Sequence, residues 1–236
     1  MVNKEIVKAL NTEFDNISPE KILLAISEKF KNTSIFTTSF GYEDQVITDM
    51  IFKNDIPISV VTLDTGRMFE ETYKVFARTF EKYKKEIKTY FPEKKEIEYL
   101  LNTKGPISFY ESIENRKECC HIRKVVPLGR ALKNNECWIT GLRASQSTNR
   151  SNLNLFELDQ GFEIIKFNPL LNWSLEDVKN YIMVNNVPYN ALHDRGFVSI
   201  GCEPCTRAIQ PGDDFRAGRW WWEQNSGKEC GLHTHE

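Results

Sequence analysis

The sequence lacks the long apolar run that a membrane-spanning helix needs. Such a helix takes about 20 consecutive apolar residues, and no apolar run in this chain approaches that length. The N-terminal residues 1–6 also lack a long apolar core after their positive charges, so we expect no secretion signal. We therefore predict a cytoplasmic location.

The chain also lacks an excess of charge of one sign. It has 31 Lys and Arg residues against 33 Asp and Glu residues, a formal net charge of -2. An extended nucleic-acid-binding surface is typically strongly basic, so we expect no nucleic acid partner. A hydrophobic share of 40% and a charged share of 27% exclude a low-complexity or wholly disordered chain. The 236 residues contain no visible repeat and no linker, and they suffice to bury a sizeable core.

Short apolar runs alternate with helical patterns in the first third of the chain. This alternation predicts an α/β fold, a Rossmann-like open and mostly parallel sheet with helices on both faces. Strands are predicted over 35–38, 58–63, 87–91, 137–140 and 164–167, and helices over 19–30, 44–53 and 69–85. No clear period follows Pro188. We therefore expect a nucleotide-binding domain over 1–187 and a loop-rich segment with a mobile tail over 188–236.

The loop after the first predicted strand is a candidate phosphate site. It reads Ser39-Phe40-Gly41-Tyr42-Glu43-Asp44 and leads directly into a predicted helix. Open parallel sheets bind ligands at this edge, where backbone N–H groups at a helix start can bind a phosphate. The loop matches neither the G-x-x-x-x-G-K-[ST] nor the G-x-G-x-x-G pattern. An ordinary turn in which Gly41 adopts an unusual dihedral angle is therefore the alternative.

Two further loops are expected at the same sheet edge. The segment Leu63-Asp64-Thr65-Gly66-Arg67 follows the second strand. Asp64 can accept hydrogen bonds from a ribose, or it can cap a turn, and Gly66 lets a flat base approach the backbone. The loop after the fourth strand carries Arg143 and Arg150. Arginine binds phosphate and sulfate through its planar fork, so this loop favours an anionic ligand.

Four of the six cysteines form a paired pattern. Cys119 and Cys120 are adjacent, and Cys202 and Cys205 form a C-x-x-C. Without a secretion signal such cysteines indicate metal ligands or reactive thiols. Adjacent cysteines are awkward around one tetrahedral zinc but can ligate neighbouring irons, so the pattern favours an iron-sulfur cluster. A zinc site that uses His121 and a vicinal disulfide are the alternatives.

Cys230 stands apart from the paired cysteines. It lies in Glu229-Cys230-Gly231-Leu232-His233 near the C-terminus. A thiolate is the attacking species, and a cysteine with an ordinary pKa of about 8.5 needs a cationic neighbour, such as His233, to ionise at neutral pH. Cys230 is therefore a candidate nucleophile. An unreactive tail thiol is the alternative.

Two other features carry structural predictions. Cys137 lies in an apolar run and is expected to be a buried strand residue without chemistry. The consecutive residues Trp220, Trp221 and Trp222 cannot all face one core, so we expect some of them to pack against the sheet domain or a second subunit, and we favour an oligomer contact.

Taken in order, these motifs resemble the assimilatory adenylylsulfate reductases, the iron-sulfur branch of the sulfonucleotide reductases. The resemblance spans about residues 37–233 and rests on Thr38–Gly41 with Glu43-Asp44, Leu63–Arg67 with Glu71-Thr72-Tyr73, Cys119-Cys120 with Ile122-Arg123-Lys124, Thr140–Arg143, Cys202-x-x-Cys205, Arg216–Trp220 and Glu229–His233. Each motif is weak alone, but the ordered set is specific. The sequence departs from the usual pattern at His121, where a small residue is expected, and at Glu70, where proline is common.

The resemblance implies an adenine nucleotide hydrolase-like fold and thioredoxin-dependent reduction of adenosine 5′-phosphosulfate to sulfite and AMP, in sulfate assimilation and cysteine biosynthesis. It implies a 4Fe-4S cluster held by Cys119, Cys120, Cys202 and Cys205. Cys230 would attack the sulfate sulfur and carry an S-sulfocysteine intermediate. The residues implied to bind substrate are Ser39, Phe40, Gly41, Glu43, Asp44, Leu63, Asp64, Thr65, Gly66, Arg67, Lys124, Arg143, Arg216, Arg219 and His233.

Expected partners are adenosine 5′-phosphosulfate, thioredoxin and further copies of the chain in a homo-oligomer. Two alternatives remain open. The substrate could be the 3′-phosphorylated nucleotide, alone or with the simpler one. The chain could also be a zinc-stabilised nucleotide-binding protein or an ATP-adenylating enzyme, although ATP pyrophosphatase relatives carry a Ser-Gly-Gly-x-Asp type turn where this chain has residues 39–44.

Overall fold

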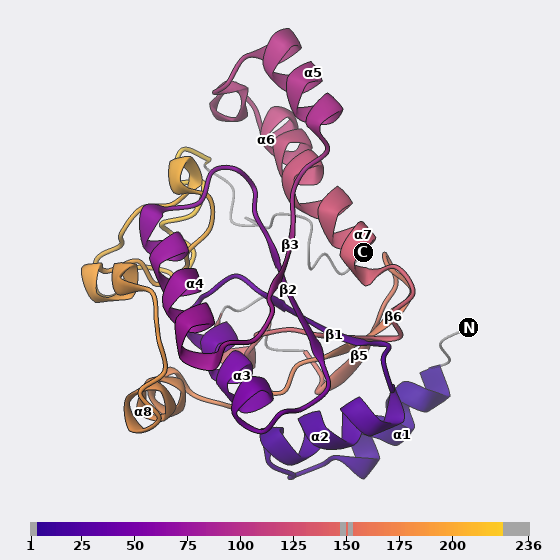
Figure 1. Ribbon diagram of the computed structural model, residues 1–236. Helices are drawn as coiled ribbons and strands as arrows, with labels where there is room; N and C mark the ends of the chain where they lie inside the picture. Colours follow the sequence, from indigo (N-terminus) through magenta and orange to yellow (C-terminus); the bar gives the residue numbers. More distant parts are fainter. Residues whose placement is uncertain (1–3, 147–149, 151–152, 224–236) are drawn as a thin grey trace. The chain divides into compact units, whose positions relative to one another are not determined.

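The computed structural model describes residues 4–146, 150 and 153–223. The strands in these ranges form one sheet in the order β3-β2-β1-β4-β6-β5 (Figure 1). Their bounds are β1 (Ser34–Thr38), β2 (Ser59–Leu63), β3 (Lys88–Tyr90), β4 (Cys137–Ile139), β5 (Phe156–Asp159) and β6 (Ile164–Phe167). β1 runs parallel to β2 and β4, and β4 runs parallel to β6, whereas β5 is antiparallel to β6. The predicted α/β class with a mostly parallel sheet is confirmed.

Helices connect and flank the strands. Their bounds are α1 (Lys4–Glu13), α2 (Pro19–Lys29), α3 (Tyr42–Lys53), α4 (Glu70–Tyr83), α5 (Lys94–Lys104), α6 (Ile113–Cys120), α7 (Val126–Leu132) and α8 (Leu175–Val184). The crossovers β1–α3–β2 and β2–α4–β3 run in the same direction along the sheet, and right-handed connections of this kind place α3 and α4 on the same face. Figure 1 shows these two helices side by side. None of the helices in the described ranges is long and apolar enough to cross a membrane.

The strand order reverses between β1 and β4. From β1 the chain proceeds outward through β2 to β3, and it then returns to place β4 on the other side of β1. Such a switch point opens a crevice at the carboxyl ends of the strands, where open α/β sheets bind ligands. The loops after β1 and β4 therefore flank the expected ligand crevice.

The core lies between the sheet and the helices that cover it. Phe36 on β1, Ile139 on β4 and Phe167 on β6 are fully buried. Helix α3 is buried almost throughout because it contacts β1, α2 and α8. Its apolar residues at positions 46, 47, 50 and 51 follow the helical spacing that predicts this burial.

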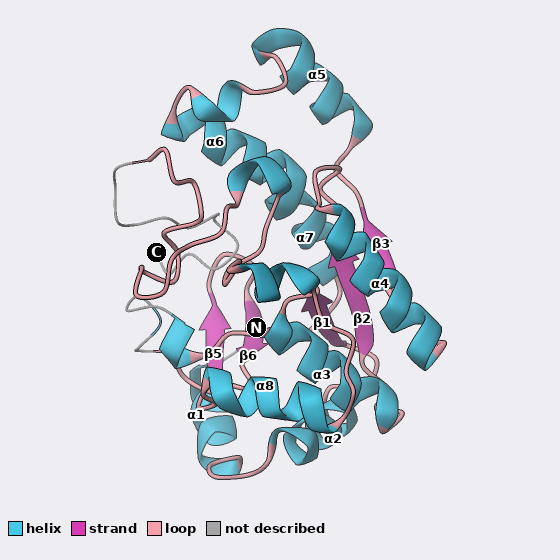
Figure 2. Cartoon of the chain, turned by 90° about the vertical axis from the view of Figure 1, so that its left-hand side faces the viewer, coloured by secondary structure: helices cyan, strands magenta, loops and turns pink. Residues whose placement is uncertain are grey.

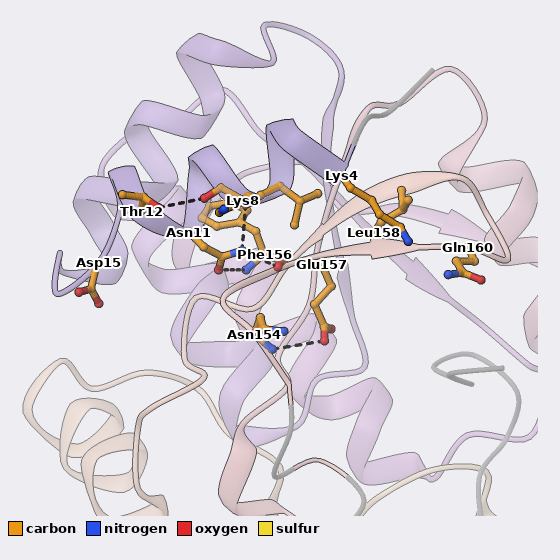
Figure 3. A pocket seen from close by; sticks show the side chains of 11 residues that line it. Lys4, Lys8, Asn11, Thr12, Asp15, Asn154, Phe156, Glu157, Leu158 and Gln160 are labelled. Carbon is orange, nitrogen blue, oxygen red and sulfur yellow. Dashed lines mark hydrogen bonds between the residues drawn. The ribbon is translucent and has the colours of Figure 1, made fainter.

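Helix α1 protects the edge strand β5, as Figure 3 shows. The side-chain Nδ2 of Asn11 donates a 2.9 Å hydrogen bond to the Phe156 carbonyl oxygen, and its Oδ1 accepts a 3.0 Å bond from the Phe156 N–H. This amide pairs with strand backbone as a neighbouring strand would. The two bonds satisfy the backbone N–H and C=O groups of Phe156 on a strand edge that could otherwise pair with another chain.

Contacts divide the described residues into two compact units. The first comprises residues 4–62, 70–88 and 134–191, and it contains most of the sheet. The second comprises 63–69, 89–133 and 192–223, and it contains α5, α6 and α7. Between 192 and 223 the only helices are short 3-10 turns, among them Glu203–Cys205, so this described segment is loop-rich as predicted.

Helix α6 continues into α7 through one π-helical turn. The Ser112 hydroxyl caps the start of α6 by accepting a 3.1 Å bond from the Asn115 N–H. The π-helical turn spans His121–Val125 and leads directly into α7 (Figure 2). Single π-helical turns are frequent at functional sites. Here it follows the cysteine pair immediately.

Candidate functional site

The loop between β1 and α3 is held together by the Asp44 carboxylate. Oδ2 of Asp44 accepts a 2.5 Å hydrogen bond from the Ser39 backbone N–H and a 2.7 Å bond from the Ser39 hydroxyl. Burial raises the pKa of Asp44 to about 6, even though the two bonds from Ser39 lower it. Asp44 is therefore a buried acid that titrates near neutral pH.

Phe40, and not Gly41, adopts the unusual backbone conformation in this loop. The φ angle is 61° at Phe40 and -72° at Gly41. The expectation that Gly41 supplies a special dihedral angle is therefore wrong. The fully buried Phe40 ring stacks on Phe76 at 4.8 Å between centroids, which fixes the residue in this uncommon conformation.

The loop after β4 meets the loop after β1 at the switch point. A Cβ atom on Gly141 would lie 2.1 Å from Oδ1 of Asp44, so only glycine fits there. Arg143 is 2% exposed, and its Nε donates a 2.7 Å bond to Oε1 of Glu43. Its Nη1 bonds to the Ser145 hydroxyl at 2.5 Å. Glu43 and Arg143 thus join the two loops, and Arg143 is engaged by protein groups.

The loop after β2 forms a tight turn in the second unit. Oδ1 of Asp64 accepts a 2.8 Å bond from the Gly66 N–H, and Gly66 has a left-handed φ of 69°. Thr65 caps the Arg67 N–H with its hydroxyl at 3.2 Å. Asp64 therefore caps a turn, as the alternative interpretation predicts. The Arg67 guanidinium lies 4.8 Å from the centre of the Phe109 ring.

Cys119, Cys120, Cys202 and Cys205 line one small cavity in the second unit. The other residues that line it are Arg67, Phe109, Arg116, Arg123 and Lys124. Positions 116, 119, 120, 123 and 124 follow the i, i+3, i+4 spacing that brings side chains to one helix face. No disulfide bond joins the cysteines in the described part of the chain, so the vicinal disulfide is not formed here.

Cations surround these thiols. Sγ of Cys202 lies 3.3 Å from the Thr65 hydroxyl oxygen, in a hydrogen bond. Burial raises the pKa of Cys202, but Lys124, the Thr65 bond and Arg219 together bring it below its ordinary value. Burial raises the pKa of Cys205 to about 12, although Arg219 and Lys124 lower it. Bound metal requires thiolates, and these cations favour that form.

The residues around the cavity fit an iron-sulfur cluster. Arg123 Nε and Trp220 Nε1 are buried and have no hydrogen-bond partner among the described residues. A buried donor without an acceptor costs about 1–3 kcal/mol, which the sulfur atoms of a cluster would offset. In the described ranges, no three His, Cys, Asp or Glu side chains converge on one metal ion.

Trp220 packs beside the cysteines inside its own chain. It is 1% exposed and packs in the same apolar cluster as Cys119, Cys120 and Cys205. Trp220 is therefore not free to make an oligomer contact, because the ring is covered by its own chain, and the expected contact stays a prediction for the other two tryptophans. Trp222 packs against Tyr110, with 4.4 Å between ring centroids.

Two predicted anion-binding arginines flank Trp220. The Arg219 guanidinium lies 4.8 Å from the centre of the Trp220 ring and that of Arg216 lies 5.6 Å from it. Arg219 is 6% exposed, and its Nε donates a 3.4 Å bond to the Cys205 carbonyl oxygen. Arg219 is therefore close to Cys205, and Arg216 is close to Trp220. Cys230 and His233 lie outside the described residues.

Comparison with known proteins identifies the family. The model of the phosphoadenosine phosphosulfate reductase domain matches residues 33–208. The chain belongs to this family. Membership confirms the resemblance that the ordered motifs predict.

Members of the family with high similarity span most of the chain. The adenosine 5′-phosphosulfate reductase of Agrobacterium fabrum is 50% identical over 201 residues, which cover 85% of this chain and 77% of the relative. That of Sinorhizobium fredii is 47% identical over 229 residues, which cover 97% of this chain and 91% of the relative. The crystal structure of the phosphoadenylyl-sulfate reductase from Candida auris in a phosphate complex matches with a TM-score of 0.74 and 33% identity, covering 89% of this chain and 98% of that one. Yeast FAD synthetase in complex with FAD shares the fold alone, with a TM-score of 0.55, 15% identity and coverage of 86% of this chain and 74% of that one.

Two arginines that line the cavity were not among the residues predicted for the site, although Arg123 stands in the Ile122-Arg123-Lys124 motif. Arg116 and Arg123 both lie on the helix face of the cysteine pair. The helical spacing from 116 to 124 carries the signal. This signal is hard to recognise in the sequence because the face carries cysteines and arginines, and not the apolar residues that mark most buried helix faces.

Proposed function

We propose that this chain is an adenosine 5′-phosphosulfate reductase that releases sulfite and AMP and takes its electrons from thioredoxin. The cavity where Cys119, Cys120, Cys202 and Cys205 meet carries the proposal. The 50% identity to a relative of that name supports the same substrate. Family membership makes the chain an enzyme of sulfonucleotide reduction.

The four cysteines would hold a 4Fe-4S cluster. Arg123 and Trp220 would donate their orphaned N–H groups toward its sulfur atoms. Lys124 and Arg219 would balance the negative charge of the thiolates, as their effect on the pKa of Cys202 indicates. When bound, the cluster would tune the electrostatics of the site without passing electrons.

The nucleotide would bind at the carboxyl edge of the sheet, where the loops after β1 and β4 meet. Backbone N–H groups at the start of α3 suit a phosphate, and Gly66 would let a flat base approach the backbone. The proposed nucleotide residues are Ser39, Phe40, Gly41, Glu43, Asp44, Leu63, Asp64, Thr65, Gly66 and Arg67. Lys124, Arg143, Arg216, Arg219 and His233 would bind the phosphosulfate end.

Cys230 would act as the nucleophile. Its thiolate attacks the sulfate sulfur, the bond from that sulfur to the bridging oxygen breaks, and AMP leaves with the bonding electron pair. The product is an S-sulfocysteine. One thiolate of thioredoxin then attacks Sγ of Cys230 and releases sulfite, and the second thiol resolves the mixed disulfide. Thioredoxin is thereby oxidised to a disulfide, and Cys230 is regenerated as a thiol.

Partner and location follow from the same assignment. Thioredoxin is the proposed reductant, and a homo-oligomer is the proposed assembly. A cytoplasmic location suits a chain whose described cysteines form no disulfide bond, because cytoplasmic thiols stay reduced.

A comparison of two nucleotides tests the function. Anaerobically purified enzyme with reduced thioredoxin should reduce adenosine 5′-phosphosulfate with a higher kcat/KM than its 3′-phosphorylated form. A clear preference for the 3′-phosphorylated nucleotide would assign the alternative substrate. Release of pyrophosphate from ATP, with no sulfite from either nucleotide, would assign the adenylating alternative.

A further inference from the structure

Asn168 is a fully buried residue that directly follows β6. Its Nδ2 donates a 2.9 Å hydrogen bond to the Asn154 carbonyl oxygen and a 3.3 Å bond to Oε2 of Glu157. Its Oδ1 accepts a 2.6 Å bond from the Thr140 hydroxyl. A side-chain amide has two donor protons and one acceptor oxygen, so both ends of this amide are paired. The two acceptors beside Nδ2 also fix which way the amide is turned.

The Thr140 hydroxyl connects Asn168 to the loop after β4. A hydroxyl has one proton and two lone pairs. Because the proton is donated to Asn168, the lone pairs are left to accept, and the Leu142 N–H donates to them at 3.4 Å. Leu142 directly precedes Arg143. The start of this loop is therefore fixed by two consecutive hydrogen bonds that begin at Asn168.

The turn that begins at Asn168 also holds the later part of the loop. The Asn168 carbonyl oxygen accepts a 3.0 Å bond from the Leu171 N–H, and the Leu171 carbonyl oxygen accepts a 2.9 Å bond from the Ala144 N–H. The Trp173 carbonyl oxygen accepts a 3.3 Å bond from Nη1 of Arg143. This turn thus holds the loop on both sides of the arginine and at the guanidinium itself.

The loop after β4 in turn meets the start of α3, where the phosphate is proposed to bind. Gly141 lies so close to the Asp44 carboxylate that a Cβ atom would be 2.1 Å from Oδ1. Nε of Arg143 donates a 2.7 Å bond to Oε1 of Glu43. Both contacts come from the loop segment that Asn168 holds. A shift of this segment would therefore displace the groups around the proposed phosphate position.

We propose that Asn168 is a positioning residue for the phosphate end of the nucleotide site, because it fixes the loop that carries Gly141 and Arg143. The inference rests on the proposed function, in which this loop and the start of α3 bind the phosphosulfate end. Asn168 does not touch the nucleotide in this scheme, since its amide is engaged by protein groups. Removing one member of such a buried network leaves other polar groups unpaired, and the loop then has to move to satisfy them.

The test uses two variants that break the bond from opposite sides. Thr140→Val removes the hydroxyl and nearly keeps the shape of the side chain, and Asn168→Ala removes the amide. Full-length enzyme purified without oxygen is titrated calorimetrically with AMP and, separately, with adenosine. AMP carries the phosphate but has no sulfate to transfer, so binding is measured without reaction.

Both variants should bind the phosphate-bearing ligand more weakly. The Kd for AMP should rise roughly tenfold or more, the scale of a lost hydrogen bond to a charged group. The Kd for adenosine should stay within about twofold of wild type, because adenosine lacks the group that the displaced loop binds. The difference between the two ligands separates positioning from a general loss of structure, which would affect both.

Three further variants sharpen the result. Thr140→Ser keeps the hydroxyl and should bind AMP like wild type. The double variant of Thr140→Val and Asn168→Ala should bind AMP no more weakly than Asn168→Ala, because both changes break the same bond. Asn11→Ala is the matched control, since the Asn11 amide also bonds to backbone of β5, at Phe156, and its other bond is to Val7 within α1. It should bind AMP like wild type.

Unchanged AMP affinity in folded Thr140→Val would overturn the inference and leave the proposed function intact. Equal weakening of AMP and adenosine would also overturn it. If Asn168→Ala does not fold, Thr140→Val and Thr140→Ser still decide between these results. Wild-type enzyme that does not bind AMP would refute the proposed function, and with it the premise of the inference.

Discussion

The buried guanidinium of Arg123 donates a 2.6 Å hydrogen bond from Nη1 to the backbone carbonyl oxygen of Thr65. The Thr65 hydroxyl in turn bonds to Cys202, at 3.3 Å. The loop after β2, the π-helical turn and the C-x-x-C segment are thus connected through one threonine. A change at the cysteines is therefore expected to alter the conformation of the loop after β2, which is proposed to bind substrate, as well as the proposed cluster site.

The first prediction concerns the metal. Cys202→Ser should lose iron and nucleotide reduction together, because a serine hydroxyl does not replace a thiolate on iron. Wild-type enzyme purified without oxygen should contain about four irons per chain. Cys137→Ala should keep its iron, since Cys137 lies in the buried strand β4 and outside the cavity. Colourless wild-type protein with stoichiometric zinc would contradict the assignment.

The central strands and the helices between them could be predicted from the sequence. β1, β2 and β6 are short apolar runs with turn residues around them, and α3 carries apolar side chains at helical spacing. Buried elements of this kind produce the strongest local pattern. Burial against a sheet is what selects such residues, so pattern and structure agree.

Other elements carry weaker or different signals. Helix α6 reads IENRKECC and has no apolar stripe, because its buried face consists of thiols and guanidinium groups. Helix α8 begins with a capping box between Ser174 and Asp177, a local signal that an apolar periodicity search overlooks. The edge strand β5 alternates over only Phe156–Asp159, too short to stand out.

Some features of the candidate site could likewise be predicted from the sequence, and others could not. The Ser39–Asp44 loop could be placed because it follows a buried strand, and the cysteine cavity could be expected from paired motifs. The bond between Glu43 and Arg143 could not be read from the sequence, since the two residues are 100 positions apart. Their meeting depends on the order of β1 and β4 in the sheet. The left-handed backbone at Phe40 likewise depends on the ring stacking with Phe76.

The second prediction concerns Arg219. Arg219→Ala should weaken nucleotide binding by about 1.5–3 kcal/mol, the range for a charged hydrogen bond. Arg219→Lys should recover only part of this, because the planar fork is lost. Isothermal titration with the nucleotide measures both. Arg207→Ala is the matched control, since Arg207 stacks at 5.4 Å on Trp221 and is exposed. Equal binding by Arg219→Ala and wild type would move the anion site elsewhere.

The third prediction concerns pH. The pKa of Asp44 rises from an ordinary 3.8 to about 6 on folding because the carboxyl is buried. Between these values the folded chain holds a proton that the unfolded chain has lost, so the free energy of unfolding falls as pH rises. The full contribution is present below about pH 4 and is lost above about pH 6, with a size of up to about 3 kcal/mol. Asp44→Asn should remove this fall in the free energy of unfolding with rising pH.

Urea unfolding of wild type and Asp44→Asn between pH 4 and 7 measures the difference directly. The stability of the variant relative to wild type should rise across this range. Asp177 is a control of opposite sign, because its hydrogen bonds to Ser174 lower its pKa. Between pH 4 and 7 the advantage of wild type over Asp177→Asn should stay constant, and it should shrink only as pH falls below about 4. Parallel curves for wild type and Asp44→Asn would show that Asp44 does not titrate abnormally.

The last prediction assigns the nucleophile. Cys230 lies outside the paired cysteines, has Gly231 beside it and has His233 three residues on as a cationic partner for its thiolate. Cys230→Ser should therefore keep its iron and bind the nucleotide but form no sulfite, because a serine hydroxyl is hardly ionised near neutral pH. Wild-type enzyme without thioredoxin should gain one SO3 group on the peptide that holds Cys230 and release one AMP per chain. Cys137→Ala should behave like wild type in both measurements. Sulfite production by Cys230→Ser, or an adduct on the peptide that holds Cys137, would refute the assignment, because either result requires a second thiol able to reach the sulfate sulfur.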